Sequence, residues 1–318
     1  MKKEIPIFYA CDDRFCKYMC VSICSLIKNS SKDMNYRIFI LHSDINTKNM
    51  NEINKLQTET VKIEFVSVVD KVSSIGKKLP LRDYYSKTTY YRLFIPELFP
   101  NYDKAIYIDS DTIVLEDVSK LYECEIGNNL VGACHEQVMI QNEIFGNYVE
   151  KVLGINRKNF FNAGLLLLNC REFRKDNVFS QFVQLLDLYD FVVTQDEDYL
   201  NFLCKDRVCW LDDGWNTEVF GNIPVLRKNL KIIHYIMAFK PWHYKDCRLG
   251  EYFWAYAKKT VYYETILDSL SSFSEEDKKK DLQSAVRLEN LAVAECCKEM
   301  TFIQLYNNRF RYEKSANY

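Results

Sequence analysis

Residues 104–111, KAIYIDSD, join an apolar run to two carboxylates that lie one residue apart. The run predicts a buried strand, and the acidic triplet follows where that strand ends. Because side chains at i and i+2 of an extended backbone point to the same side, Asp109 and Asp111 can face one cation or one phosphate group. Two carboxylates offer the hard oxygen ligands that suit Mg²⁺ or Mn²⁺. A polar turn that only closes a strand would show the same pattern, so the triplet alone leaves both interpretations open.

The residues before this stretch alternate between strand and helix patterns. Apolar or alternating runs predict strands at 5–10, 36–41 and 62–69, and amphipathic patterns predict helices at 15–28 and 46–57. This alternation implies parallel pairing and a doubly wound α/β sheet, in which ligands bind beyond the carboxyl ends of the strands. The rule directs attention to the turn at 10–13 and to the triplet at 109–111.

The rest of the chain predicts shorter elements. We expect helices at 88–98 and 176–189, and strands at 104–108, 112–115, 130–134, 160–169, 208–211 and 231–235. Residues 70–87 lack periodicity and predict a long loop that could cover the site. Helices are expected again at 251–270 and from 274 to about 300, with acidic residues in the first turn of the second. The chain is therefore expected to form a catalytic domain over 1–245 and a helical C-terminal extension over 246–318.

Composition argues against several classes of protein. The 318 residues carry a formal net charge of -2, which gives no basic footprint for nucleic acid. The longest apolar run, residues 163–168, is far shorter than the ~18 residues of a membrane span. The first ten residues hold no stretch long enough for a signal peptide, and the twelve cysteines include no CxxC pair. These features predict a cytoplasmic protein whose cysteines are mostly buried, reduced thiols.

Short segments follow one another in a specific order: TTYYRL at 88–93, DSD at 109–111, FNAGLLLLN at 161–169, QDEDYLN at 195–201, HY at 234–235 and KPW at 240–242. Over about residues 5–245 this series resembles glycosyltransferase family 8, which includes bacterial lipopolysaccharide galactosyl- and glucosyltransferases and glycogenin. The resemblance implies a GT-A fold, with a Rossmann-like mixed sheet flanked by helices, and a UDP-sugar donor. It also implies retention of the anomeric configuration and a divalent metal, usually Mn²⁺, with Mg²⁺ as the alternative.

The resemblance assigns roles at the diphosphate end of the donor. Asp109, Asp111 and His234 would be the metal ligands, and an imidazole beside two carboxylates tilts the preference from Mg²⁺ toward Mn²⁺. Taken alone, a histidine in an apolar strand is more often a core residue. Ser110 lies between the two carboxylates, in the segment that would meet the metal and the diphosphate. Lys240 would hold the diphosphate, where negative charge develops as UDP leaves.

Other assignments concern the base and the phosphates. Ala10 and Asp12 match the uridine-binding turn, where the aspartate can hydrogen-bond the uracil. Phe15 matches an aromatic residue placed against the base, although core packing explains this residue equally well. Arg92 matches an arginine that reaches the donor phosphate or sugar, with a charge on a helix surface as the alternative.

The last assignments concern the transferred sugar. Asn162 and Ala163 match the segment that lines the sugar, and Asp196 matches an aspartate that hydrogen-bonds its hydroxyl groups. Glu197 stands where the family usually has glutamine, beneath the anomeric carbon. A glutamate there is chemically competent as a nucleophile, so we hypothesise that Glu197 stabilises the oxocarbenium-like transition state or forms a transient glycosyl-enzyme. Contact with the acceptor or with bulk water is the alternative.

Three more positions depart from the family pattern. Arg14 replaces an asparagine, so uridine contacts there could be rearranged. Glu136 stands where an aspartate often contacts the sugar, and we expect the longer arm to do the same. Met237 replaces a glycine that lets the backbone approach phosphate, so we expect a looser approach.

The expected function is transfer of a hexose, galactose or glucose first, from UDP to a hydroxyl group of a surface glycan or lipopolysaccharide-type acceptor. A UDP-N-acetylhexosamine transferase and a non-catalytic nucleotide- or glycan-binding descendant are alternatives, and a metal-dependent phosphohydrolase is a weaker one. Residues 302–314 mix aromatic and basic side chains, which suits a peripheral contact with the inner face of the membrane. Packing on the catalytic domain or on another subunit explains that segment equally well. The acceptor's identity is not expected to be readable, because the segments at 70–87 and 137–158 that would build its pocket are variable loops.

Overall fold

A computed structural model describes residues 2–75, 79–81, 87–221, 223–225 and 227–315, with side chains described up to residue 309 of the last helix. Its strands are β1 (Glu4–Ala10), β2 (Asn35–His42), β3 (Val61–Ser67), β4 (Ala105–Ile108), β5 (Thr112–Val114), β6 (Val131–Ala133), β7 (Leu165–Leu168), β8 (Val208–Trp210), β9 (Thr217–Glu218) and β10 (Ile232–His234). Seven of them form one sheet in the order β3-β2-β1-β4-β7-β6-β8, and β5-β10-β9 form a small second sheet. The predicted α/β class is confirmed.

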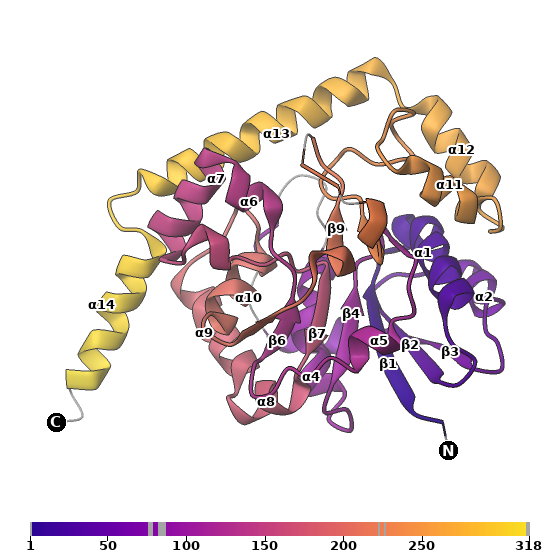
Figure 1. Ribbon diagram of the computed structural model, residues 1–318. Coiled ribbons are helices and arrows are strands. Elements are labelled where there is room, and N and C mark those ends of the chain that lie inside the picture. Colours follow the sequence, from indigo (N-terminus) through magenta and orange to yellow (C-terminus); the bar gives the residue numbers. More distant parts are fainter. Residues whose placement is uncertain (1, 76–78, 82–86, 222, 226, 316–318) are drawn as a thin grey trace.

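The helices surround these sheets (Figure 1). They are α1 (Cys16–Asn29), α2 (Thr47–Asn54), α3 (Val69–Ser74), α4 (Ile95–Leu98), α5 (Ser119–Tyr122), α6 (Gln137–Gln141), α7 (Glu143–Tyr148), α8 (Cys170–Lys175), α9 (Val178–Leu188), α10 (Asp196–Cys204), α11 (Gly250–Ala257), α12 (Tyr263–Ser272), α13 (Glu275–Cys296) and α14 (Phe302–Ser315). Short 3-10 helices cover Asp13–Phe15, Lys87–Phe94, Arg157–Asn159, Asp213–Asn216 and Arg227–Asn229, and a π-helical turn covers Val149–Leu153.

The strand register places the two predicted site turns at one edge of the sheet. β1 is parallel to both β2 and β4, and Phe8 lies opposite Tyr107. Successive residues of β1 point to opposite faces, so Ile7 and Phe8 pack into different hydrophobic clusters. Parallel strands that are buried on both faces end at the same edge, which brings the turn after Ala10 beside the triplet after β4.

Parallel pairing is interrupted in the middle of the sheet and resumes between β6 and β8 at its edge. β7 runs antiparallel to both β4 and β6, so the sheet is mixed. β7 is also shorter than the predicted strand at 160–169, because Phe161 makes only an isolated bridge with His135 before the chain turns toward the site. The β10 strand pairs with β5, which places His234 directly opposite Thr112, one residue after the acidic triplet.

Several predicted loops and helices differ from the structure. α3 lies inside the loop predicted at 70–87, of which residues 76–78 and 82–86 are outside the described residues, and α6 and α7 occupy the predicted loop at 137–158. The helix predicted at 176–189 begins only at Val178, because Asn177 adopts a left-handed conformation with φ 52° after α8. The helix predicted at 251–270 is divided into α11 and α12. α10 was not predicted, although its three acidic residues suit the first turn of a helix.

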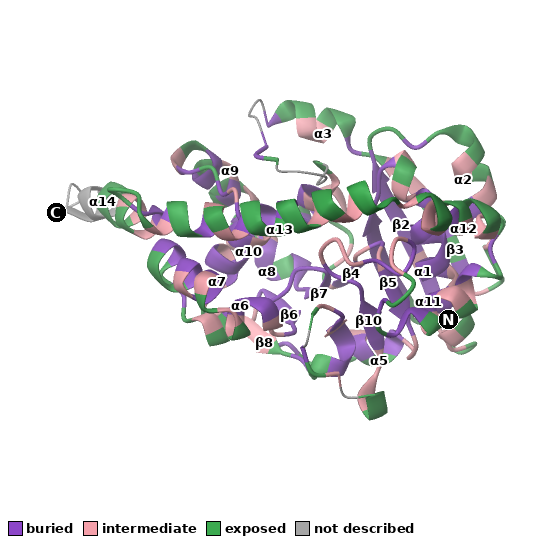
Figure 2. Ribbon diagram, turned by 90° about the horizontal axis from the view of Figure 1, so that it is seen from above, coloured by how far each residue is buried: buried purple, intermediate pink, exposed green. Residues whose placement is uncertain are grey.

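α13 is a long helix that passes over the carboxyl ends of the parallel strands, as Figure 1 and Figure 2 show. It begins at the position where the acidic first turn predicts a helix, and a capping box between Ser274 and Asp277 closes its first turn. Its inner face buries Leu288 and Ala292, whereas Leu282 is exposed. The chain then continues into α14, where Phe302 is completely buried.

Candidate active site

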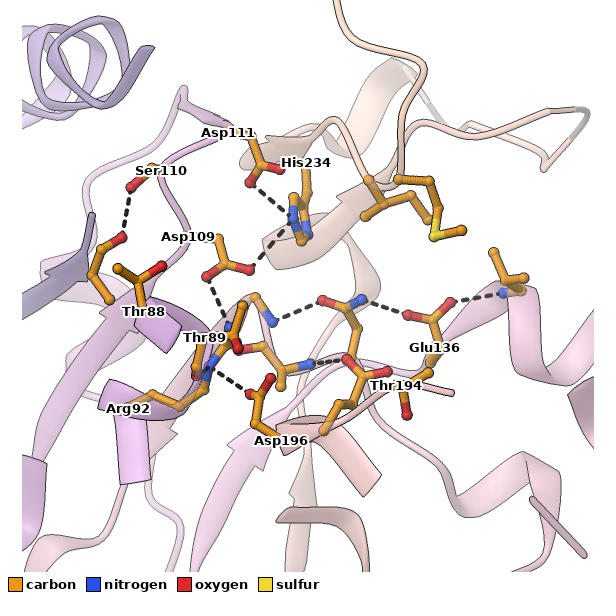
Figure 3. Close-up of a pocket in the computed structure, with 18 of the residues that line it drawn as sticks. Thr88, Thr89, Arg92, Asp109, Ser110, Asp111, Glu136, Thr194, Asp196 and His234 are labelled. Carbon is orange, nitrogen blue, oxygen red and sulfur yellow. Dashed lines mark hydrogen bonds and ion pairs between the residues drawn. The ribbon is translucent and has the colours of Figure 1, made fainter. Parts of the chain in front are cut away.

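A cavity at the carboxyl edge of the large sheet collects every residue predicted for the site. It is lined by Ala10, Asp12, Phe15, Arg92, Asp109, Ser110, Asp111, Asn162, Ala163, Asp196, Glu197, His234 and Lys240. Segments from both halves of the sheet, together with Leu288 of α13, complete the lining. Figure 3 shows the acidic, basic and imidazole groups pointing toward one another. The tertiary structure therefore brings together predicted residues that lie up to 230 positions apart, from Ala10 to Lys240.

Asp109, Asp111 and His234 form one cluster of ligand atoms that lie within 4.8 Å of one another. His234 Nε2 is 3.2 Å from Asp111 Oδ1 and 3.8 Å from Asp109 Oδ2. Two carboxylate oxygens and one imidazole nitrogen are suitable donors for a divalent cation such as Mn²⁺. The Tyr107 hydroxyl donates to the other oxygen of Asp109 at 2.6 Å, which leaves Oδ2 directed at His234. The cluster therefore has the donor set of a metal site.

Arg92 is a buried cation that joins the Asp109–Asp111–His234 cluster to the start of α10. Its guanidinium makes ion pairs with Asp109 at 3.2 Å and with Asp196 at 3.0 Å. It also donates to the carbonyl of Ala163 and lies over the Tyr107 ring, 4.5 Å from its centroid. Burial opposes its charge, but the two carboxylates outweigh burial and raise the pKa of Arg92 above its ordinary value. The alternative of a surface charge is wrong, because the side chain is only 5% exposed.

Lys240 contacts the other carboxylate of the acidic cluster, that of Asp111. Its ammonium group donates to Asp111 Oδ2 at 2.5 Å and to the carbonyl of Tyr235. Burial opposes ionisation of Asp111, but Lys240 and then His234 outweigh it and hold the pKa of Asp111 below its usual range. Asp111 is thus an ionised carboxylate between two nitrogen groups.

The turn after β1 forms another part of the cavity wall. Asp12 caps the following 3-10 helix by accepting from the Phe15 amide at 3.0 Å, and its second oxygen pairs with Arg14 at 3.0 Å. Arg14 is 80% exposed, so this pairing can yield to a ligand. Phe15 lines the cavity and also packs edge-to-face on Tyr18. Its position is therefore compatible with a contact to the base and with core packing. The Ser110 hydroxyl donates to the carbonyl of Ala10 at 3.0 Å and ties the two turns together.

Asp196 and Glu197 lie in the first turn of α10 and line the cavity. Burial raises the pKa of Asp196 to about 7, even though Arg92 opposes the shift. Glu197 accepts a hydrogen bond from the Ala163 amide at 2.8 Å. Burial, and then the neighbouring carboxylate of Glu136, raise the pKa of Glu197 well above its ordinary value. The residue before them, Gln195, has φ 58° and ψ -115°, a strained conformation of the kind found at functional sites.

The structure explains two of the departures from the family pattern. Met237 lines the cavity with φ 59°, the left-handed conformation that glycine adopts most easily. The backbone thus keeps a glycine-like turn at this position at a cost on the order of 1 kcal/mol. The Glu136 carboxylate also lines the cavity, and its expected contact with the sugar stays a prediction. One oxygen accepts from the Val138 amide at 3.0 Å and the other from the Asn162 side chain at 2.5 Å, so Glu136 orients Asn162.

Three residues of the site were missed by sequence reasoning. Asn216 hydrogen-bonds both His234 and Asn162. Gly164 lies so close to the cluster that a Cβ there would fall 2.1 Å from His234 Cε1. Glu218 accepts from the Gln137 amide beside Glu136, and burial followed by that neighbour raises its pKa well above the ordinary value. The sequence marks none of them, because an asparagine in a polar turn and a glycine in an apolar run are both commonplace.

The comparisons with known proteins place this geometry in a family. The model of glycosyl transferase family 8 matches residues 6–246, which is most of the chain. The chain belongs to glycosyltransferase family 8. The match contains the metal-type cluster, Arg92, Lys240, Asp196 and Glu197, and it ends shortly before α11.

Individual relatives agree with this membership. A putative glycosyltransferase of Haemophilus influenzae is 31% identical over an alignment of 263 positions, which covers 78% of this chain and 77% of the relative. The lipopolysaccharide glucosyltransferase WaaO of Escherichia coli is 26% identical over 75% of this chain and 73% of its own. The galactosyltransferase LgtC, solved with donor and acceptor sugar analogues, has a TM-score of 0.65 and 26% identity, covering 81% of this chain and 96% of LgtC. LgtC has also been solved as an active-site glutamine-to-glutamate mutant.

Together these findings give the fold and the general activity. The mixed sheet flanked by helices is a GT-A fold, and the protein is a glycosyltransferase. None of the helices that the structure describes combines the length and the hydrophobicity needed to span a bilayer.

Proposed function

We propose that this glycosyltransferase is metal-dependent and retaining, and that it moves a hexose from UDP to a hydroxyl group of a surface glycan or lipopolysaccharide-type acceptor. The observation that carries the proposal is the cluster of Asp109, Asp111 and His234, which opens into one cavity with the Arg92–Asp196 ion pair. WaaO and LgtC are named as a glucosyl- and a galactosyltransferase, which supports glucose or galactose as the first donors to test.

The diphosphate end of the cavity has the charges that departure of UDP requires. A divalent ion held by the three-residue cluster, Mn²⁺ in our proposal, would neutralise negative charge on the leaving group. Lys240 adds a positive charge whose position is set by Asp111 and by the carbonyl of Tyr235. A fixed cation costs no reorganisation when charge develops, so it stabilises the transition state more than a mobile surface lysine would.

The sugar end offers acceptors for hydroxyl groups and a carboxylate for the reactive face. We assign Asp196 to the sugar hydroxyls, because Arg92 holds it at the wall of the cavity. Glu197 lines the same wall, beside Ala163. When ionised, a carboxylate enclosed in a cavity of low dielectric interacts strongly with positive charge that develops beside it. This supports Glu197 as the group that stabilises an oxocarbenium-like transition state or forms a transient glycosyl-enzyme.

Replacing Glu197 with glutamine is expected to lower kcat by about 10²-fold or more, with a much smaller change in KM, because the lost interaction belongs to the transition state. Steady-state UDP release measures this effect. Glu143→Gln, on the exposed surface of α7, is the matched control and should leave kcat unchanged. Intact mass spectrometry with a slow fluorinated donor separates the two roles, since only a nucleophile gives an adduct. Near-normal turnover of Glu197→Gln without any adduct would remove both roles.

The proposed function is tested by UDP release from a panel of UDP-glucose, UDP-galactose and their N-acetylated counterparts, with Mn²⁺, with Mg²⁺ and with EDTA. We expect turnover of a hexose donor that requires the metal and is lost in Asp111→Asn. Preference for an N-acetylated donor would show that the transferred sugar is an N-acetylhexosamine and not a hexose. If UDP does not bind even with Mn²⁺, the protein is instead a non-catalytic descendant.

The C-terminal extension is proposed to complete the cavity. Leu288 of α13 lines it, and Phe302 at the start of α14 stacks edge-to-face against Phe191 and Phe202 of the catalytic region. Phe302 is therefore occupied by packing within the protein. If residues 302–314 contact the membrane, we propose that they do so through side chains other than Phe302. We therefore propose that residues 1–245 form the catalytic region and that residues 246–318 pack against it as an extension of the same unit.

A further inference from the structure

Asn216 occupies a buried position between the metal-type cluster and the sugar-lining segment. It ends the 3-10 helix Asp213–Asn216, directly after Trp215, whose side chain is packed into the hydrophobic core. Its side chain is almost completely enclosed. The oxygen of its amide group lies 3.0 Å from His234 Nδ1, and its nitrogen lies 2.9 Å from the side-chain oxygen of Asn162.

The direction of these hydrogen bonds follows from a backbone group. The Gly164 amide can only donate, and it donates to Asn162 Oδ1 at 2.9 Å. The nitrogen of Asn162 then faces the Glu136 carboxylate, which can only accept when it is ionised. The atom of Asn216 that faces Asn162 Oδ1 must therefore be the NH₂ group. Its oxygen consequently faces His234 and requires a proton on Nδ1.

The consequence for His234 is a defined tautomer. A neutral imidazole carries one proton, so a proton on Nδ1 leaves the lone pair on Nε2. Nε2 is the nitrogen that faces Asp109 and Asp111. Metal-binding histidines generally have their second nitrogen held by such a partner, which orients the ring and raises the basicity of the ligand.

We propose that Asn216 is a positioning residue that holds His234 in the tautomer required for metal binding and that links this ligand to the sugar-lining residue Asn162. The chain of hydrogen bonds runs from the Gly164 amide through Asn162 and Asn216 to His234. The two bonds of Asn216 serve different ends of the donor, so they can be separated by mutation.

Asn216→Ala removes the acceptor for the His234 Nδ1 proton and the donor for Asn162. We expect the affinity for Mn²⁺ to fall by about 10- to 100-fold, the range known for loss of such partners. The free Mn²⁺ signal in electron paramagnetic resonance, recorded for the full-length protein with and without UDP, measures the affinity without relying on turnover. Asn229→Ala is the matched control, since Asn229 bonds Asp212 beside the same 3-10 helix but makes no recorded bond to His234.

Asn216→Asp separates the two bonds. At pH 8 its carboxylate keeps an acceptor for His234, but it faces Asn162 Oδ1 with a second oxygen instead of a donor. We expect Mn²⁺ affinity within about 3-fold of the native value or tighter, and a kcat for donor hydrolysis at least about 10-fold lower. This divergence between metal affinity and turnover is not expected of general structural damage. The Asp variant also tests the proposal if Asn216→Ala fails to fold.

The proposal rests on the proposed metal dependence, and the outcomes distinguish the two. Absence of Mn²⁺ binding in the native protein would overturn the proposed function itself. Native Mn²⁺ binding in folded Asn216→Ala would overturn the role of Asn216 alone. An equal loss in Asn229→Ala, or lost Mn²⁺ binding in Asn216→Asp, would likewise assign the effect to the loop and not to the hydrogen bond.

Discussion

Replacing Gly164 with alanine is expected to weaken metal binding and donor turnover severely. A Cβ at this position would lie 2.1 Å from His234 Cε1 and 2.9 Å from Asp109 Oδ2, so two of the proposed ligands must move. Neither is free to do so. Asp109 is tied to Gly164 through its own amide, which donates to the Gly164 carbonyl at 2.8 Å, and His234 belongs to the central strand of the small sheet. We expect Mn²⁺ affinity and kcat each to fall by about 10²-fold or more, because a ligand displaced by 1 Å no longer completes the site.

The Gly164→Ala variant should nevertheless remain folded. Overpacking by one methyl group costs about 1–3 kcal/mol, less than the 5–15 kcal/mol typical of a whole domain. Gly250→Ala is the control, since a Cβ there meets ordinary contacts at 3.6 Å and the residue begins α11. Circular dichroism and Mn²⁺ titration of both variants check the expectation. Native Mn²⁺ affinity in Gly164→Ala would show that the metal is bound elsewhere.

Replacing Arg92 with methionine is expected to lower the free energy of unfolding by about 3–5 kcal/mol, because it leaves two buried carboxylates without their cation. Asp109 and Asp196 would both lose a partner at about 3 Å, and the Ala163 carbonyl would lose a donor. Lysine should not rescue the protein, since one ammonium cannot make the several directed contacts of a guanidinium. Urea unfolding of the native and variant proteins measures the difference.

The stability deficit of Arg92→Met should also grow with pH. Asp196 has a pKa of about 7 in the native structure, and loss of the opposing charge of Arg92 raises it further. A group whose pKa is raised on folding contributes stability at low pH and loses it as pH rises through the folded-state value. The deficit should therefore be larger at pH 8 than at pH 6. Arg227→Met, which breaks an exposed pair with Glu251, should cost less than about 1 kcal/mol at both values. Equal deficits in the two variants would contradict the role given to Arg92.

Local patterns in the sequence were sufficient wherever a strong periodicity or a special residue order was present. The strands β1, β2 and β3, the helix α1, and the acidic triplet after β4 all lie where the patterns predict them. The ordered motifs also led to the family, and every residue predicted for the site lines the same cavity. These features depend on side-chain alternation and on residue type, which are properties of the sequence itself.

The tertiary structure decided what depends on contacts between distant segments. The antiparallel direction of β7, the passage of α13 over the cavity and the burial of Arg92 all arise from packing of distant parts of the chain. Asn216 shows this dependence on distant contacts most clearly. It is an ordinary polar residue in the sequence, yet the fold encloses it between His234 and Asn162, 18 and 54 residues away. A buried side-chain amide must pair its polar atoms, so the role of Asn216 depends on neighbours that only the folded chain supplies.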